Sequence, residues 1–389
     1  FPPMGVYETL FRFAEVTHKY MGDPGTHPWA QGFPLTTQLP GGPPLPSGVD
    51  IVSSDLKYPA ATGQAEVRQA IADMYNAHYG LTLTADHVAL FAGGRPAIYA
   101  TLAFLLDDVT VAVEETEYTP YLDMLQLLER PYRLVPSNEA NRFRPAIADY
   151  EVAPAAGTSR PFLLKSNPCN PTGVSVSGND LRLLVERFSA DGCGALFDEA
   201  YEFFNEPAQE SALRYVRDID ATNVFVVGAA TKGLQAPGIR LGWAIASRSN
   251  IELFRNFSSI GMGGVSRLSQ LYVLQLLEPE RLKLARSAVP AFYNAQRARY
   301  ADGLKRLGLG LFTGNGGFYH WAKLPGTLDA IALNERLFAY GAAILPGRLC
   351  DMNRKPGAPS ALDRFVRFSF GPLSSDSYDQ DMEILSACL

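Results

Sequence analysis

Short, almost wholly apolar segments recur through the middle of the chain, and polar or glycine-rich residues follow each of them. Five such segments predict buried strands, at residues 109–113, 161–164, 194–197, 224–227 and 241–246. A strand that is buried on both faces lacks the alternation of a half-exposed strand. The pattern therefore favours a mostly parallel sheet with helices on both faces, which is an α/β fold.

Helical periodicity fills much of the remaining chain. Residues 6–20 predict an N-terminal helix, and residues 95–106 predict a second one that starts beside Pro96. A long helix is expected at 278–307. Strands expected near 309–313, 317–322, 342–345 and 365–370, with helices near 328–340 and 374–387, indicate a smaller α+β domain. We expect an N-terminal segment (1–45) that packs with the small domain, a large α/β domain (46–280) and a small C-terminal domain (281–389).

Composition narrows the possible partners. The 389 residues are 47% hydrophobic and 19% charged, which is typical of a globular protein. The net charge of −6, without a Lys/Arg-rich run, argues against nucleic acid as a partner. We expect no membrane span and no signal peptide, because the apolar runs are short and the start FPPMGVYETL lacks the required pattern. Neither the cysteines nor the histidines have metal-ligand spacing, so we expect no metal and a cytoplasmic location.

Four polar motifs fall at the ends of predicted strands, where an open α/β sheet binds its ligands. The first is FAGGRPA (91–97), in which a glycine pair precedes a helix and lets backbone N–H groups approach an anion. The second is SNPCNPTG (166–173), in which two Asn-Pro pairs hold an extended turn that can fix the amide of Asn170. Taken singly, each motif is also explained as an ordinary turn.

The other two motifs contain charged residues. In LFDEAY (196–201), Asp198 ends an apolar strand, and Tyr201 can face the same ligand. In GAATKGLQAPGIRLGW (228–243), a polar pocket with a second cation favours the neutral amine of Lys232, which then serves as nucleophile and base. Arg240 suits a permanent dianion such as phosphate. A solvated loop lysine and a satisfied carboxylate are the simpler interpretations of each residue alone.

In this order, the motifs NPxNPTG, DExY and T-K followed by PGxRxGW resemble the fold-type I pyridoxal-phosphate enzymes, specifically the class I/II aminotransferase family. The resemblance extends over about residues 32–367. It implies a seven-stranded-type sheet and pyridoxal 5′-phosphate as the cofactor. Lys232 would form the Schiff base, and Asp198 would pair with the pyridine nitrogen. Tyr201 and Asn170 would bind the ring 3′-oxygen, and Tyr118 would stack on the ring.

The same resemblance assigns the remaining site residues. The backbone of Gly94 and Arg95 would bind the cofactor phosphate, with Arg240 as its charged partner. Tyr58 would reach the phosphate of a neighbouring subunit, which implies a homodimer with shared active sites. The substrate α-carboxylate would be bound by Arg367 and Gly32, together with Asn170.

The implied reaction moves the amino group of an L-α-amino acid to a 2-keto acid, with Lys232 as the general base. Three alternatives keep the same scaffold: carbon–sulfur β-elimination by a lyase, decarboxylation and oxidative deamination. Ala229 and Thr231 stand where many relatives carry serine, which leaves the reaction type open. A non-catalytic ligand-binding module is a further alternative, against which the complete set of reactive residues argues.

The substrate side chain is also left open. An uncharged or aromatic side chain is favoured by Phe33, Tyr121 and Met262. Three arginines could instead bind a distal acid or pair with surface carboxylates: Arg95, Arg267 and Arg348.

Overall fold

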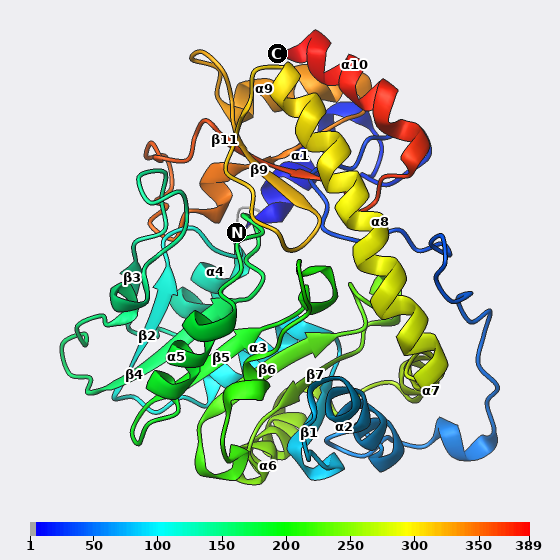
Figure 1. Ribbon diagram of the computed structural model, residues 1–389, viewed down its shortest axis with the longest axis vertical. Helices are drawn as coiled ribbons and strands as arrows, with labels where there is room; N and C mark the ends of the chain where they lie inside the picture. Colours follow the sequence, from blue (N-terminus) through cyan, green and yellow to red (C-terminus); the bar gives the residue numbers. More distant parts are fainter. Residues whose placement is uncertain (1–4) are drawn as a thin grey trace.

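Two β-sheets organise the chain in the computed structural model, which describes residues 5–389 (Figure 1). The larger sheet has seven strands in the order β1-β7-β6-β5-β4-β2-β3. Their bounds are β1 Val88–Phe91, β2 Val109–Glu114, β3 Tyr132–Val135, β4 Arg160–Ser166, β5 Gly194–Asp198, β6 Val224–Ala229 and β7 Gly242–Ile245.

The predicted mostly parallel α/β sheet is confirmed. All five predicted apolar segments form strands of the larger sheet, and every residue of β2, β5 and β7 is buried. β7 alone runs antiparallel to its neighbours β1 and β6. The strand prediction missed β1, which has four residues, and β3, an edge strand whose first three residues are partly exposed. In β3, weak burial at the edge of the sheet removes the apolar run on which the prediction depended.

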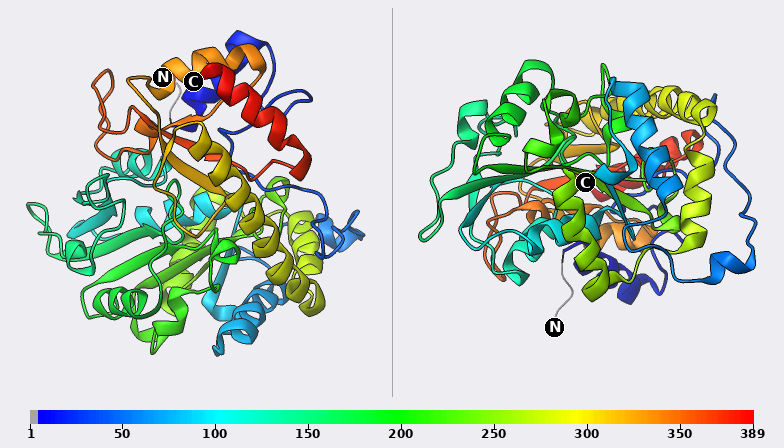
Figure 2. Two further views of the ribbon diagram at one scale, coloured as in Figure 1. Left: turned by 45° about the horizontal axis from the view of Figure 1, so that its top comes forward. Right: turned by 90° about the horizontal axis from the view of Figure 1, so that it is seen from below.

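Helices cover both faces of this sheet (Figure 2). Successive residues of β5 show the two faces, because Phe197 and Leu196 belong to different core clusters. Val67 of α2 and Leu181 of α5 lie in the cluster of Phe197, and Ile98 of α3 lies in that of Leu196. The helices of this part are α2 Ala65–Tyr79, α3 Gly94–Ala103, α4 Pro120–Leu127, α5 Gly178–Phe188, α6 Arg248–Phe257 and α7 Arg267–Leu276.

The smaller sheet has four strands in the order β10-β11-β9-β8. Their bounds are β8 Gly310–Leu311, β9 Tyr319–Lys323, β10 Leu345–Pro346 and β11 Phe365–Ser369. The long helix α8 (Pro279–Arg306) runs from the larger sheet to the smaller one, which also carries α9 (Ala330–Leu337) and α10 (Tyr378–Cys388) (Figure 1).

The N-terminal helix α1 (Val6–Thr17) packs on this smaller part. The ring of Phe13 lies 5.9 Å from that of Phe338, and both belong to one core cluster with Phe365. Residues 1–4 of the predicted N-terminal segment lie outside the described residues.

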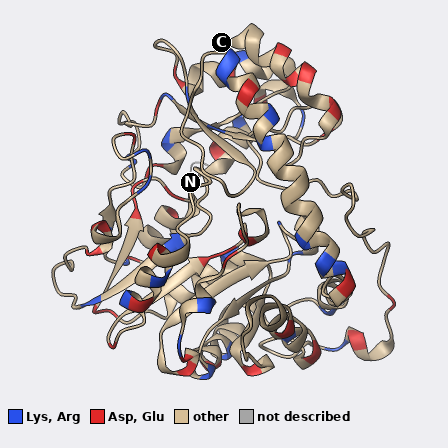
Figure 3. Ribbon diagram, viewed as in Figure 1, with Lys and Arg blue, Asp and Glu red and all other residues tan. Residues whose placement is uncertain are grey.

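Acidic and basic side chains are interspersed along the helices of both parts (Figure 3). Among residues 5–389, no helix combines the length and the apolar character that a membrane crossing needs.

Candidate active site

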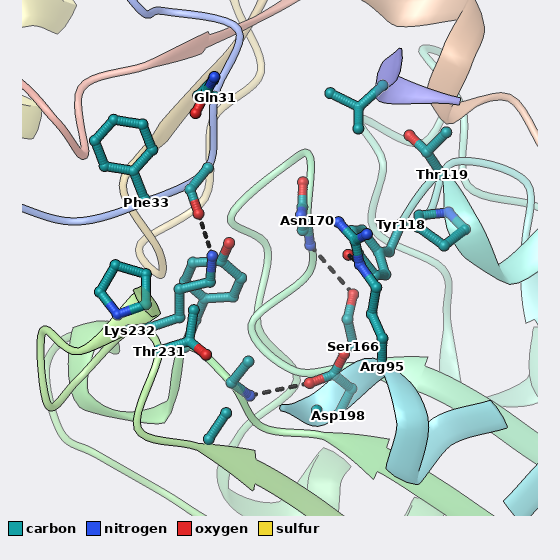
Figure 4. A pocket seen from close by; sticks show the side chains of 18 of the residues that line it. Gln31, Phe33, Arg95, Tyr118, Thr119, Ser166, Asn170, Asp198, Thr231 and Lys232 are labelled. Atoms are coloured by element: carbon teal, nitrogen blue, oxygen red, sulfur yellow. Dashed lines mark hydrogen bonds between the residues drawn. The ribbon is translucent and has the colours of Figure 1, made fainter. Parts of the chain in front are cut away.

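A pocket of about 400 Å³ lies between the two sheets, where β4, β5 and β6 of the larger sheet end (Figure 4). The size is in the usual range for a small-molecule site. The structure brings ten of the eleven predicted site residues to its wall: Gly32, Gly94, Arg95, Tyr118, Asn170, Asp198, Tyr201, Lys232, Arg240 and Arg367. The eleventh, Tyr58, is 96% exposed and lies outside the pocket.

The turn between β1 and α3 forms an anion-binding end of the pocket. Gly93 has φ +104°, and a Cβ atom there would lie 2.4 Å from Nη2 of Arg240. Only glycine therefore allows the guanidinium to lie against this turn. The Arg240 guanidinium donates to the carbonyls of Pro237 (2.9 Å) and Ala92 (3.3 Å). A guanidinium beside the first backbone N–H groups of α3 is an arrangement that binds a phosphate group.

Asp198 lies at the floor of the pocket, at the last position of β5. Its Oδ2 accepts a hydrogen bond from the hydroxyl of Tyr121 (3.0 Å), and its Oδ1 accepts one from the backbone N–H of Ala200 (3.1 Å). Burial raises the pKa of Asp198, whereas these two bonds and the charge of Lys232 lower it. The carboxylate keeps free lone pairs, so it can accept a further hydrogen bond from a protonated ring nitrogen.

Lys232 enters the pocket from the loop that follows β6. Its Nζ donates to the carbonyl of Gly32 and lies 5.4 Å from the ring centre of Tyr201. Burial and the charges of Arg367, Arg95 and Arg240 lower the pKa of Lys232 to about 7, although Asp198 acts in the opposite direction. A neutral amine is the nucleophilic form, so the site supplies it near neutral pH.

Arg367 of β11 forms the opposite wall of the pocket. Its Nη1 donates to Oδ1 of Asn170 (2.8 Å) and its Nη2 to the carbonyl of Ala30 (2.6 Å). The guanidinium also lies 4.3 Å from the ring centre of Tyr319. Within residues 5–389, its Nε is buried without a hydrogen-bond partner. Such a held but incompletely bonded guanidinium suits a carboxylate ligand.

Two aromatic residues complete the wall between Lys232 and Arg367. The hydroxyl of Tyr201 shares a hydrogen bond with that of Tyr319, and both side chains are buried. Tyr118 lies opposite, and its hydroxyl accepts a 2.5 Å hydrogen bond from Nε of Arg95.

Several wall residues had no signal in the sequence. Tyr319 lies in a strand of the smaller sheet, and no motif in the sequence marks that strand as part of a ligand site. The amphipathic pattern of α1 predicted packing, yet α1 also contributes Val6, Tyr7 and Leu10 to the pocket.

The residues considered for the substrate side chain divide into two groups. Phe33 and Arg95 line the pocket. Met262 and Tyr121 do not line it, and Tyr121 is fully buried with its hydroxyl on Asp198. Tyr121 therefore orients the carboxylate instead of contacting a substrate.

Two of the three arginines considered for a distal acid have carboxylate partners elsewhere. Arg267 pairs with Asp55 (2.8 Å) and Glu66 (2.7 Å), and Arg348 pairs with Asp363 (2.8 Å). Both lie outside the pocket wall.

Proteins of known structure share this fold. Solved structures similar to this one include aspartate aminotransferase from Thermus thermophilus with maleate, at a TM-score of 0.80 and 22% identity over 100% of this chain and 97% of that chain. This likeness shows the fold.

Relatives in sequence include the valine–pyruvate aminotransferase of Mycobacterium tuberculosis, which is 28% identical over 83% of this chain and 81% of that protein. The probable aspartate/prephenate aminotransferase of Thermus aquaticus is 26% identical over 80% of this chain and 83% of that protein. The 1-aminocyclopropane-1-carboxylate synthase 1 of Oryza sativa is 28% identical over 79% of this chain and 66% of that protein. The family model for class I and II aminotransferases matches residues 50–380. The chain therefore belongs to the class I and II aminotransferase family.

Proposed function

We propose that the protein is a pyridoxal 5′-phosphate-dependent aminotransferase in which Lys232 carries the cofactor and transfers the proton. Membership of the family supports both pyridoxal phosphate as the cofactor and transamination as the reaction. The assignment of residues rests on one observation above all: the amine of Lys232, the carboxylate of Asp198 and three guanidinium groups line a single pocket.

The wall of the pocket fits pyridoxal phosphate along its length. The glycine turn and Arg240 suit the phosphate, because a guanidinium lies directly against the start of a helix. Asp198 retains acceptor capacity for the ring nitrogen, and Tyr118 offers a ring face on the opposite side. Lys232 lines the same pocket as these groups and Arg367, so its amine would be within reach of a cofactor held by the former and a substrate held by the latter.

Each of these side chains has a separate role in the proposed reaction. When bound, pyridoxal phosphate supplies an electrophilic carbon and an acceptor for the electrons of the broken Cα–H bond. Arg367 and Asn170 hold the substrate α-carboxylate and thereby fix the direction of its Cα–H bond. The Nζ of Lys232, with its pKa lowered to about 7, accepts the proton from Cα and can return it to a neighbouring carbon. Asp198 would accept a hydrogen bond from a protonated ring nitrogen and stabilise its charge.

The same site could also catalyse a reaction other than transamination. The likeness to 1-aminocyclopropane-1-carboxylate synthase 1 extends over 79% of this chain, so similarity at this level is not confined to proteins named as aminotransferases. Elimination, decarboxylation and oxidative deamination differ from transamination only in what leaves after proton transfer. The products therefore distinguish these reactions.

Removal of the amine tests the role of Lys232. We expect the purified protein to show a visible absorbance band with pyridoxal phosphate, and Lys232→Ala to lack that band and to lose activity. Lys323→Ala is the control, because Lys323 ends β9 and pairs with Glu139 outside the pocket. A band that persists in Lys232→Ala would exclude Lys232 as the covalent attachment point.

We further propose a homodimer in which Tyr58 reaches the phosphate of the partner's cofactor. The support is a group of exposed apolar side chains on two adjoining segments, near residues 51–58 and 260–268, which are joined by the Arg267–Asp55 ion pair. These side chains are Ile51, Val52, Leu56, Tyr58, Ile260 and Leu268. A large exposed apolar patch is typical of an interface. Leu56→Asp should shift the protein toward monomer in sedimentation velocity; an unchanged dimer would place the interface elsewhere.

The division of the chain into residues 1–45, 46–280 and 281–389 is likewise our proposal, supported by the packing of Phe13 on Phe338 and Phe365. A cytoplasmic location is supported by the four cysteines, all of which are free thiols. Limited proteolysis tests the domain boundaries, and cell fractionation tests the location.

A further inference from the structure

A buried group of charged residues lies beside the pocket, and the proposed mechanism uses none of it. Glu114, Glu117 and Lys165 are at most 2% exposed and lie at or just beyond the carboxyl ends of β2 and β4. Lys165 pairs with Glu114, which also accepts a 2.5 Å hydrogen bond from the hydroxyl of Tyr150. Charges are costly to bury unless they are paired and hydrogen-bonded. Within residues 5–389, Glu117 has no such cation in direct contact, so its contacts need a separate explanation.

The carboxylate of Glu117 binds two loops at once. Its Oε1 accepts a hydrogen bond from the backbone N–H of Ser166 (2.9 Å). Its Oε2 accepts one from the hydroxyl of Ser166 (2.6 Å) and one from the backbone N–H of Tyr118 (2.7 Å). The carboxylate therefore joins the loop after β2 to the end of β4.

The chain of hydrogen bonds continues into the pocket. Oγ of Ser166 accepts a hydrogen bond from the backbone N–H of Asn170 (3.2 Å), a contact that is drawn in Figure 4. Ser166, Asn170 and Tyr118 all line the pocket, whereas Glu117 does not. One buried carboxylate thus fixes both the residue placed to stack on the cofactor ring and the turn that holds Arg367 through Asn170.

We propose that Glu117 is a positioning residue that sets Tyr118 directly, and Asn170 through Ser166, against the cofactor. This inference rests on the proposed function. Glutamine cannot replace the carboxylate, because its NH₂ group would face an N–H or O–H donor at one of the two oxygen positions. Alanine at position 166 breaks the same chain one step later, since Asn170 N–H then loses its acceptor.

A second buried carboxylate supplies a matched control. Glu199 is 3% exposed and directly follows Asp198, as Glu117 directly precedes Tyr118. Its Oε1 accepts a 2.7 Å hydrogen bond from the backbone N–H of Ala212, which lies outside the pocket. Glu199→Gln therefore makes the same chemical change at a similar depth without touching the wall of the pocket.

The experiment measures three quantities for each variant: the Kd for pyridoxal phosphate, the visible circular dichroism of the bound cofactor, and the melting temperature of the cofactor-free protein. We expect Glu117→Gln and Ser166→Ala each to raise the Kd about tenfold, equivalent to about 1.4 kcal/mol, and to change the dichroism. The double variant should have the same Kd for pyridoxal phosphate as the single variant with the larger Kd, because both changes break one chain of contacts. Glu199→Gln should leave the Kd and the dichroism unchanged, because only Oε1 accepts the Ala212 N–H and a glutamine can keep an oxygen there.

Three results would overturn the inference: a wild-type Kd and dichroism in Glu117→Gln, additive effects in the double variant, or an equal rise in Kd for Glu199→Gln. If Glu117→Gln does not fold, Ser166→Ala is the deciding variant. The inference requires it to raise the Kd for pyridoxal phosphate, and an unchanged Kd would overturn the inference. A wild-type protein that takes up no pyridoxal phosphate would refute the proposed function and this inference together. Normal uptake with an unaffected Glu117→Gln would refute only the inference.

Discussion

Arg367 of the smaller sheet donates through Nη1 to Oδ1 of Asn170, which follows β4 of the larger sheet, at 2.8 Å. The contact joins the two parts of the molecule across the pocket, and both side chains are buried. A substrate carboxylate bound here would be held by groups from both parts, so substrate binding and the relative placement of the two sheets are coupled.

Arg367→Lys should impair substrate binding more than cofactor binding. Lysine keeps the charge but cannot make the two parallel hydrogen bonds that a guanidinium makes with a carboxylate. Loss of one hydrogen bond between charged groups costs about 1.5–3 kcal/mol, so kcat/KM should fall about 10-fold to 150-fold. Steady-state kinetics and a cofactor titration check this together. A weaker Kd for pyridoxal phosphate with unchanged kcat/KM would contradict the assignment.

The cofactor-free protein should be stabilised by Lys232→Met below about pH 7. The folded-state pKa of Lys232, about 7, lies below its usual value of 10.5. The unfolded chain therefore binds more protons between these values, and the stability of the wild-type protein rises with pH across that window. The difference in free energy of unfolding between Lys232→Met and the wild-type protein should be largest below pH 7 and should shrink to its minimum as the pH approaches 10.5. Urea unfolding over this range measures it, and a gap independent of pH would contradict the lowered pKa.

Tyr121→Phe should slow the reaction while the cofactor stays bound. The tyrosine hydroxyl donates to Oδ2 of Asp198 and lowers the pKa of that carboxyl, so its removal weakens the carboxylate as a partner for a protonated ring nitrogen. We expect a loss of about 1.5 kcal/mol and about a tenfold fall in kcat/KM. Tyr272→Phe is the control, since its hydroxyl donates to the carbonyl of Pro46. Equal kinetics for both variants would exclude a role for the hydroxyl of Tyr121.

Gly93→Ala should weaken cofactor binding beyond its effect on the backbone. The added Cβ would lie 2.4 Å from Nη2 of Arg240 and displace the guanidinium. Gly157→Ala is the control, because Gly157 also has a positive φ (+82°) but has nothing within 4 Å of a Cβ position. Both variants should lose about 1–3 kcal/mol of stability, whereas only Gly93→Ala should raise the Kd for pyridoxal phosphate about tenfold or more. Parallel shifts in both would assign the effect to strain alone.

The sequence indicated the site residues that belong to rigid local motifs. Lys232, Asp198 and Asn170 each follow a buried apolar segment, and the geometry of parallel strands brings such positions to one edge. Tyr319 and the residues of α1 reach the pocket only because the smaller part packs over the larger sheet. No local sequence pattern predicts that packing. Tyr121 is three residues from Tyr118, yet the two side chains point to different partners, which depends on the packing of α4.

Pairing across long sequence distances explains the remaining differences. Arg267 was one of three candidates for a distal acid, and its partner Asp55 is 212 residues away. A single sequence gives no signal for such a pair. The same holds for Glu117, whose partner Ser166 lines the pocket but is 49 residues away in the sequence.

A single-turnover reaction tests the central claim most directly. The holoenzyme is mixed with each of a panel of L-α-amino acids in the absence of a keto acid, and the absorbance of the cofactor and the released products are followed. Transamination predicts one equivalent of 2-keto acid and an amine form of the cofactor, which a second 2-keto acid converts back. Release of ammonia, a thiol or carbon dioxide with an unconverted cofactor would contradict the account and assign the site to another reaction.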